Sequence, residues 1–162
     1  MKITRLETIW FEAIPDAVWQ QRSPHSRQAL PNNLWVQIHT DEGLIGLGET
    51  YYLPRAVNAV IHDLFAPLLL GRDALDIENH WNNLFSLASF CGYAGAEMRA
   101  ISAIDIALWD LAGQYSEQPI YNLLVGAIAK VSPSTTPALD SENIPITLHG
   151  ARDAPASLRR IF

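Results

Sequence analysis

The sequence has almost no cysteine, no excess of positive charge and no long apolar run, and each shortage excludes a class of protein. Its single cysteine, Cys91, rules out an internal disulfide framework and a cysteine-rich zinc site. The formal charge of −6 argues against nonspecific binding to nucleic acid or an anionic membrane, because both require a basic surface. No stretch approaches the roughly 18 apolar residues of a membrane span, and residues 1–11 lack the apolar core of a signal peptide. We therefore expect a cytoplasmic globular protein of 162 residues whose partners are small molecules or other proteins.

The N-terminal part of the chain has the patterns of three β-strands. Residues 2–13 are rich in β-branched and aromatic side chains, which favours a strand. In residues 33–52 apolar positions alternate with polar or bulky ones, and the Asp-Glu-Gly sequence at 41–43 predicts a turn between two antiparallel strands. Residues 14–33 contain three prolines and no steady apolar period, so they predict a long loop.

From Pro54 onward the apolar period lengthens to between three and four residues, which predicts helices. One helix is predicted at residues 54–69, where Pro54 suits a helix start, and another at 73–90. The apolar face of the first helix consists of Val57, Val60, Ile61 and Leu64. The face of the second consists of Ile77, Trp81, Leu84, Phe85 and Ala88, and the candidate N-caps are Asp73 and Asp76. A third and longest helix is predicted at 96–114, and a short helical turn at 119–124. These elements define an α+β fold in which a three-stranded antiparallel sheet is followed by a helical bundle.

The helix predicted at 96–114 has few positions suited to water. One broad face is apolar and contains Ala100, Ile101, Ile104, Ala107, Leu108, Leu111 and Ala112. The opposite face mixes Ser102, Asp105 and Asp110 with Ile106 and Trp109. Because a tryptophan among carboxylates indicates partial burial, we expect this helix to pack on two sides. The alternative is an ordinary central helix of a small domain. In either case the alanines allow close approach of neighbouring elements, and the aspartates need partners such as backbone amides or arginines.

Residues 99–124, RAISAIDIALWDLAGQYSEQPIYNLL, closely resemble the signature of the mandelate racemase/muconate lactonising enzyme family of the enolase superfamily. The matching positions are Ser102, Ala103, Asp105, Ala107, Leu108, Asp110, Gly113, Gln114, Pro119, Ile120, Leu123 and Leu124. Upstream, the order of strand, long loop, hairpin and helices also resembles the N-terminal capping domain of that family. We therefore interpret residues 1–124 as such a domain. The resemblance implies that it packs on a (β/α) barrel, with Asp105, Ile106, Trp109 and Asp110 at the domain interface.

The resemblance stops at Val125, which stands where the family signature has a glycine. Residues 125–162 contain four prolines and predict an irregular, mobile tail with at most a short strand at 144–148. A barrel needs on the order of 200 residues or more, so this tail cannot supply one. A truncated gene, a lost reading frame or half of a split enzyme would each explain the pattern, and the expected partner is then a barrel domain or a companion chain.

In the family, a base removes the proton α to a carboxylate while Mg²⁺ stabilises the enediolate. The resemblance places the metal ligands and the bases on the barrel, so we expect no catalytic residue, metal ligand or cofactor in this chain. The chain alone is then inactive. Asp105 and Asp110 lie five positions apart on a helix and point about 140° away from one another, which favours structural hydrogen bonding over metal ligation.

The resemblance also implies that the capping domain selects the substrate through the loop after the first strand and the segment after the hairpin. The loop carries Trp19, Arg22, His25 and Arg27 and has no acid between Asp16 and Asp41. This local positive charge suits an anionic, hydroxyl-rich substrate such as an acid sugar. In the second segment, Tyr51 and Tyr52 are the candidate substrate contacts. The alternative is that the loop residues are merely solvated and the tyrosines merely pack.

A function of another class is also consistent with the sequence. The chain could be a non-enzymatic module that binds a partner through the face that would otherwise dock a barrel. Ile106 and Trp109 motivate this hypothesis, because they are apolar residues on the more polar side of the helix. The sequence also leaves a homo-oligomer open.

Overall fold

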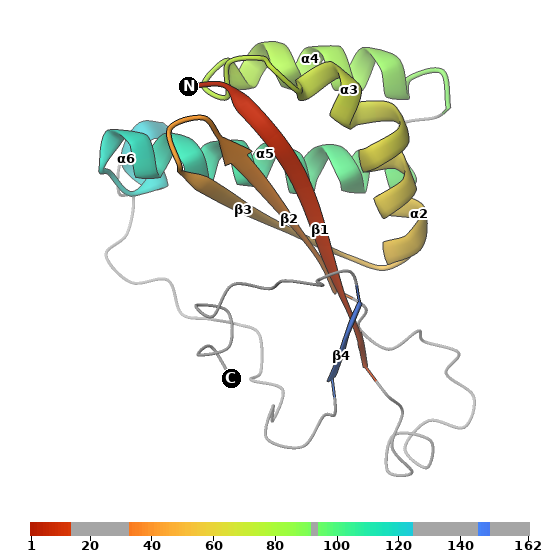
Figure 1. The fold of residues 1–162 in the computed structure, drawn as a ribbon. Coiled ribbons are helices and arrows are strands. Elements are labelled where there is room, and N and C mark those ends of the chain that lie inside the picture. Colours follow the sequence, from red (N-terminus) through yellow and green to blue (C-terminus); the bar gives the residue numbers. More distant parts are fainter. Residues whose placement is uncertain (14–32, 92–93, 125–145, 150–162) are drawn as a thin grey trace, which may run out of the picture.

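The structure is a computed structural model that describes residues 1–13, 33–91, 94–124 and 146–149 (Figure 1). It contains the predicted antiparallel meander of β1 (Ile3–Ala13), β2 (Asn33–Thr40) and β3 (Ile45–Tyr51). The turn between β2 and β3 includes Gly43 at φ 84°, a left-handed conformation that glycine adopts without strain. The α+β prediction, with a three-stranded antiparallel sheet followed by helices, is confirmed.

The sheet also has a fourth strand, β4 (Ile146–His149), which pairs antiparallel with the C-terminal end of β1. The strand order is therefore β3-β2-β1-β4. The strand expected at residues 144–148 overlaps β4. The remainder of the predicted tail, residues 125–145 and 150–162, lies outside the described part of the chain, as do residues 14–32 of the loop predicted at 14–33.

The long helix α5 (Ala96–Ser116) packs along one face of the sheet and lies behind β3 and β2 in Figure 1. All of its predicted apolar face is buried except Ala112, which is half-buried, and Ala103 is buried as well. Two glycines of β3, Gly46 and Gly48, allow the strand to touch the helix backbone. A methyl group added at either one would collide with the carbonyl group of Ala107 or Ala103, respectively. The expected close approach of neighbouring elements at the alanines is therefore present.

The first helical segment runs continuously from Pro54 to Leu69, as predicted, but its middle turn is wider than an α-helix. It consists of α2 (Pro54–Ala59), the π-helical turn η1 (Val60–Phe65) and α3 (Ala66–Leu69). A π-helical turn holds more residues than an α-helical turn, so it changes which side chains face the core. Phe65 is fully buried, whereas Leu64, which was predicted on the apolar face, is 39% exposed.

The second helix, α4 (Ile77–Ala88), follows its predicted pattern except at one position. Trp81 was predicted to be buried, but it is 38% exposed, and His80 is buried in its place. The imidazole is accommodated because its Nε2 lies 2.7 Å from the carbonyl oxygen of Asp73. The helical period does not mark this histidine as a core residue, and its burial depends on a contact between elements. Asp76 occupies the N-cap position, although its side chain makes no capping hydrogen bond.

The hydrophobic core lies between the sheet and the helices. Its largest fully buried side chains are Ile3, Leu34, Ile38, Ile61, Phe65, Leu69, Leu84, Ile101, Ile104, Leu108 and Leu111. Each such side chain stabilises the fold by about 1.5–3 kcal/mol relative to an exposed position. A short helix, α6 (Ile120–Leu124), follows α5. None of the helices in the described part of the chain combines the length and apolar character that a bilayer span requires.

Candidate functional site

Tyr51, Tyr52 and Leu53 form the corner between β3 and α2, and all three side chains are exposed. Tyr52 and Leu53 have φ values of 70° and 53°, so two consecutive residues with bulky side chains adopt the left-handed conformation. Such strain persists only where surrounding contacts hold the backbone in place. We refer to residues 51–53 as the β3–α2 corner.

Arg99, in the first turn of α5, contacts this corner from the neighbouring element. Its Nη1 donates a hydrogen bond to the carbonyl oxygen of Tyr51 at 2.9 Å. The guanidinium carbon lies 4.9 Å from the centre of the Tyr51 ring and 5.3 Å from that of the Tyr52 ring, distances typical of cation–π contacts. One side chain thus links α5 to both candidate substrate-contacting tyrosines. The sequence pattern did not single out Arg99 for this role, because the contact joins residues 48 positions apart.

Three of the four predicted interface residues lie on a face of α5 that is only partly covered. Ile106 is 45% exposed, and Trp109 is half-buried with its ring packed against the edge of the core. Asp105 is half-buried, and among the described residues its carboxylate has no hydrogen-bond or ion-pair partner. Burial raises the pKa of the Asp105 carboxyl above its ordinary value, because the charged form loses contact with water. This face therefore combines exposed apolar surface with a half-buried acid that no other described residue pairs.

Asp110, the fourth predicted interface residue, is bound within its own domain. Its Oδ2 accepts hydrogen bonds from the backbone N–H of Leu47 at 2.8 Å and from Nε2 of Gln114 at 2.9 Å. The Gln114 amide also donates to the carbonyl oxygen of Ile45 at 2.8 Å. Because β3 is an edge strand, these side chains satisfy backbone groups that no neighbouring strand pairs. The backbone-amide partner expected for Asp110 is therefore present.

The loop residues proposed to contact substrate, Trp19, Arg22, His25 and Arg27, lie outside the described residues and remain predictions. Within the described ranges, no three histidine, cysteine, aspartate or glutamate side chains come together as a metal-binding group. Those residues do not fit a magnesium site, and we assign no metal-dependent step to them.

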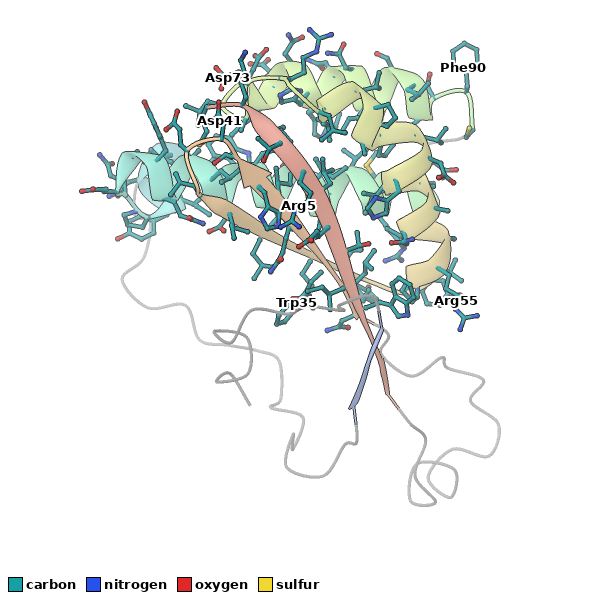
Figure 2. All side chains as sticks on the ribbon, in the orientation of Figure 1. Arg5, Trp35, Asp41, Arg55, Asp73 and Phe90 are labelled. Atoms are coloured by element: carbon teal, nitrogen blue, oxygen red, sulfur yellow. The ribbon has the colours of Figure 1, made fainter. Side chains whose placement is uncertain are left out.

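One polar cluster that the sequence did not reveal lies on the face of the sheet opposite α5 (Figure 2). Arg5 Nη1 lies 2.6 Å from Glu7 Oε1, and His39 Nε2 lies 3.1 Å from Glu7 Oε2. These residues meet because Arg5 is paired with His39 in the β1–β2 register. Knowledge of the register would have predicted the cluster, but alternation alone does not fix which residues stand opposite one another.

A second polar cluster joins β1 to the first helical segment. The Thr8 hydroxyl hydrogen-bonds to Oδ1 of Asn58 and lies 2.8 Å from Nε2 of His62. A consistent arrangement has the hydroxyl donating to Asn58 and accepting from His62. The π-helical turn contains His62, so it helps to position the ring against Thr8 of β1.

Solved structures that share this fold include enolases and other members of the enolase superfamily. An enolase of the mandelate racemase subgroup from Agrobacterium tumefaciens superposes with a TM-score of 0.59 and 41% sequence identity, over 78% of this chain and 30% of that one. A racemase from Streptomyces coelicolor A3(2), solved with bound magnesium, superposes with a TM-score of 0.68 and 33% identity, over 77% of this chain and 36% of that one. The fold therefore defines an N-terminal capping domain of the enolase superfamily.

Within that superfamily, the chain belongs to the mandelate racemase/muconate lactonizing enzyme family, whose N-terminal domain profile matches residues 13–125. A D-galactonate dehydratase family member from Paenibacillus sp. strain JDR-2 is 39% identical over 107 residues, which cover 63% of this chain. Arabinonate dehydratase from Saccharolobus solfataricus is 36% identical over 109 residues, which cover 66% of it. The matched region spans only 26% and 29% of the length of these two relatives.

Proposed function

We propose that this chain is the capping and substrate-specificity domain of a magnesium-dependent acid-sugar dehydratase or racemase. Relatives named as D-galactonate, arabinonate and D-mannonate dehydratases support this substrate class. The observation that carries the proposal is the β3–α2 corner, where Tyr51 and Tyr52 are exposed on a strained backbone. A tyrosine offers an apolar ring and a hydroxyl group, a combination that suits a hydroxylated carbon chain. The cations of the predicted loop, Arg22 and Arg27, would attract the substrate carboxylate.

The partly covered face of α5 supports docking on a barrel. A second domain placed there would cover Ile106 and Trp109 and could donate a hydrogen bond or a positive charge to Asp105. Asp110 belongs at the margin of this proposed interface, because one of its oxygens is already bound to β3. The carboxylate of Asp105, half-buried and without a partner among the described residues, favours docking at this face over simple exposure to solvent.

The chemical step of the proposed reaction is the removal of a proton α to a carboxylate. Magnesium, when bound in the barrel, supplies electrostatic stabilisation of the charge that develops on the substrate. The described residues of this chain would instead contact and orient the substrate and exclude water from it. We therefore expect the 162-residue chain to be catalytically silent without a barrel.

A chimera tests the capping role directly. Residues 1–124 replace the N-terminal domain of the Paenibacillus relative, and turnover of D-galactonate, D-mannonate and arabinonate is measured with Mg²⁺. We expect the chimera to turn over at least one acid sugar and the isolated chain to turn over none. Tyr52→Ala should raise KM in the chimera, whereas Phe90→Ala, a change at a 92% exposed residue outside the corner, should not. Turnover by the isolated chain would contradict its expected silence, and equal KM values for the two variants would contradict the role of the corner.

The alternative is a non-enzymatic module that uses the same face of α5 to bind a protein partner or a second copy of the chain. The exposure of Ile106, at 45%, is the observation that favours it. Light scattering on the purified chain discriminates between the two functions. Self-association that is abolished by Ile106→Asp would support the module, and a monomer at all concentrations would count against an adhesive face.

A further inference from the structure

We propose that Arg99 is a positioning residue that holds the β3–α2 corner in its strained conformation and so sets how tightly the capping domain binds its substrate. The second half of this inference rests on the proposed function, whereas the first half concerns the fold alone. The signature at residues 99–124 does not by itself assign this role to Arg99. The inference follows from three contacts of its side chain.

The corner needs an external restraint, because its backbone conformation is unfavourable. Tyr52 and Leu53 are both left-handed, and neither is a glycine, an asparagine or an aspartate, which tolerate that conformation best. The chain must turn here because β3 ends at Tyr51 and α2 begins at Pro54, which leaves two residues for the connection. A relaxed corner would move both tyrosine rings, since Tyr52 is itself one of the strained residues and Tyr51 directly precedes it.

Arg99 is suited to restrain the corner because it acts on backbone and rings together. The hydrogen bond fixes the carbonyl oxygen of Tyr51, immediately before the strained residues. Both rings lie within cation–π distance of the same guanidinium group, so their positions are coupled to one another. A lysine at this position would carry a compact charge and lack the planar guanidinium group, so it could not donate the hydrogen bond and lie against both rings at the same time.

The same contacts argue that Arg99 acts through the tyrosines and does not itself bind the substrate. Its guanidinium group is engaged by two aromatic rings and a carbonyl oxygen, and the side chain is partly buried. The tyrosine rings, in contrast, are 62% and 48% exposed. The two tyrosines therefore offer a ligand more exposed surface than Arg99 does.

Hydrogen exchange on the full chain tests the positioning role without any assumption about catalysis. The reporter is the amide of Val57, which donates to the carbonyl oxygen of Leu53 at 3.0 Å, and the reference is the amide of Ile104 in the middle of α5. Arg99→Met should accelerate exchange at Val57 by about tenfold, as expected for the loss of one charge-assisted hydrogen bond. Ile104 should change by less than about twofold on the same scale.

Two further variants make the result specific. Arg99→Lys should accelerate hydrogen exchange at Val57 to an intermediate degree, because lysine keeps the positive charge and lacks the planar guanidinium group. Arg55→Met removes an exposed arginine of α2 near the same corner and should change neither amide (Figure 2). Unchanged exchange at Val57 in Arg99→Met would overturn the proposal. Equal acceleration at Val57 and Ile104 would also overturn it, because Arg99 would then support the whole fold.

Kinetics of the chimera separate this inference from the proposed function. Arg99→Met should raise KM for the acid sugar several-fold with a smaller change in kcat, and Arg55→Met should leave both unchanged. If exchange at Val57 accelerates while KM stays constant, Arg99 positions the corner but the corner does not face the substrate, which contradicts the proposed function. If KM rises without faster exchange at Val57, the positioning role is overturned.

Discussion

The contact between β3 and α5 leads to a prediction about Gly48. A Cβ atom at this position would lie 2.9 Å from the carbonyl carbon of Ala103 and 3.0 Å from the backbone nitrogen of Ala107, and closer still to the Ala103 carbonyl oxygen. Non-bonded carbon atoms normally rest about 3.5–4.0 Å apart, so the helix or the strand would have to shift by at least about 0.6 Å. We therefore expect Gly48→Ala to disrupt the sheet–helix interface.

The magnitude follows from the kind of atoms that collide. Overpacking a core with one methyl group costs about 1–3 kcal/mol, and backbone atoms cannot move aside by changing rotamer, which places this change at or above 3 kcal/mol. The lower entropy of the unfolded alanine variant offsets about 0.4–1 kcal/mol of that. The net loss is thus about 2 kcal/mol or more, a large part of the roughly 5–15 kcal/mol that stabilises a typical domain.

Urea unfolding followed by circular dichroism measures this loss as a fall in the midpoint at constant slope. Gly43→Ala is the control, because its new methyl group meets nothing within 4 Å and only the φ of 84° is unfavourable. We expect the control to lose about 1 kcal/mol, because the same entropic offset reduces the cost of about 1–2 kcal/mol for a left-handed residue. The double variant Gly48→Ala/Ala103→Gly should not recover, because the collision involves the carbonyl group of Ala103 and not its methyl group. Recovery, or a Gly48→Ala midpoint equal to that of the wild type, would refute the close approach of the two backbones.

Three further predictions concern polar groups. Burial raises the pKa of Asp105, so the charged carboxylate costs more free energy in the folded chain than in the unfolded chain. Asp105→Asn should therefore stabilise the isolated chain at pH 7, and urea midpoints should show this gain fading as the pH falls toward the ordinary value of 3.8. A gain that persists unchanged at pH 3.5 would point to a cause other than charge. Asp110→Ala should cost about 1–3 kcal/mol and increase self-association in light scattering, because the outward N–H of Leu47 loses its partner; an unchanged midpoint would contradict this. Thr8→Val should cost about 1–2 kcal/mol of unfolding free energy, because it leaves partly buried partners such as His62 without their hydrogen bond. Thr4→Val, at an exposed position of β1, is the control. A loss of the same size in the control would show that the effect comes from the change to valine in this strand and not from the cluster.

The elements that follow a regular period were predictable from the sequence. The alternation at Leu34, Val36 and Ile38 and the helical period from Ala100 to Leu111 identify faces whose burial the structure confirms. These patterns are readable because each depends only on neighbours within one element.

The features that the patterns missed depend on contacts between elements. His80 is buried because a carbonyl group seven positions earlier accepts its hydrogen bond, and hydrophobic period alone predicts Trp81 there instead. Arg99 becomes part of the candidate site only because the chain after β3 folds back onto the first turn of α5. The resemblance of the signature run predicts an interface role for both Asp105 and Asp110, and the fold shows that Asp110 also binds its own strand. Periodicity cannot distinguish the two acids, because their difference is set by the position of β3.

Three of the few polar side chains on α5 contact the edge of β3 and fix how the helix lies along the strand. Gln114 reaches the carbonyl oxygen of Ile45 at the start of the strand, and Arg99 reaches that of Tyr51 at its end, so helix and strand run antiparallel. Fifteen helical residues rise about 22 Å, and the six-residue step along the strand spans about 20 Å, so the two spacings match. A shift of the helix by one turn would break both contacts and the Asp110 contact between them, which fixes the register. Because side chains of α5 already occupy this edge, a further strand cannot pair with it without displacing them. A barrel or partner that docks on this domain would therefore contact side chains of the helix and would not extend the sheet at β3.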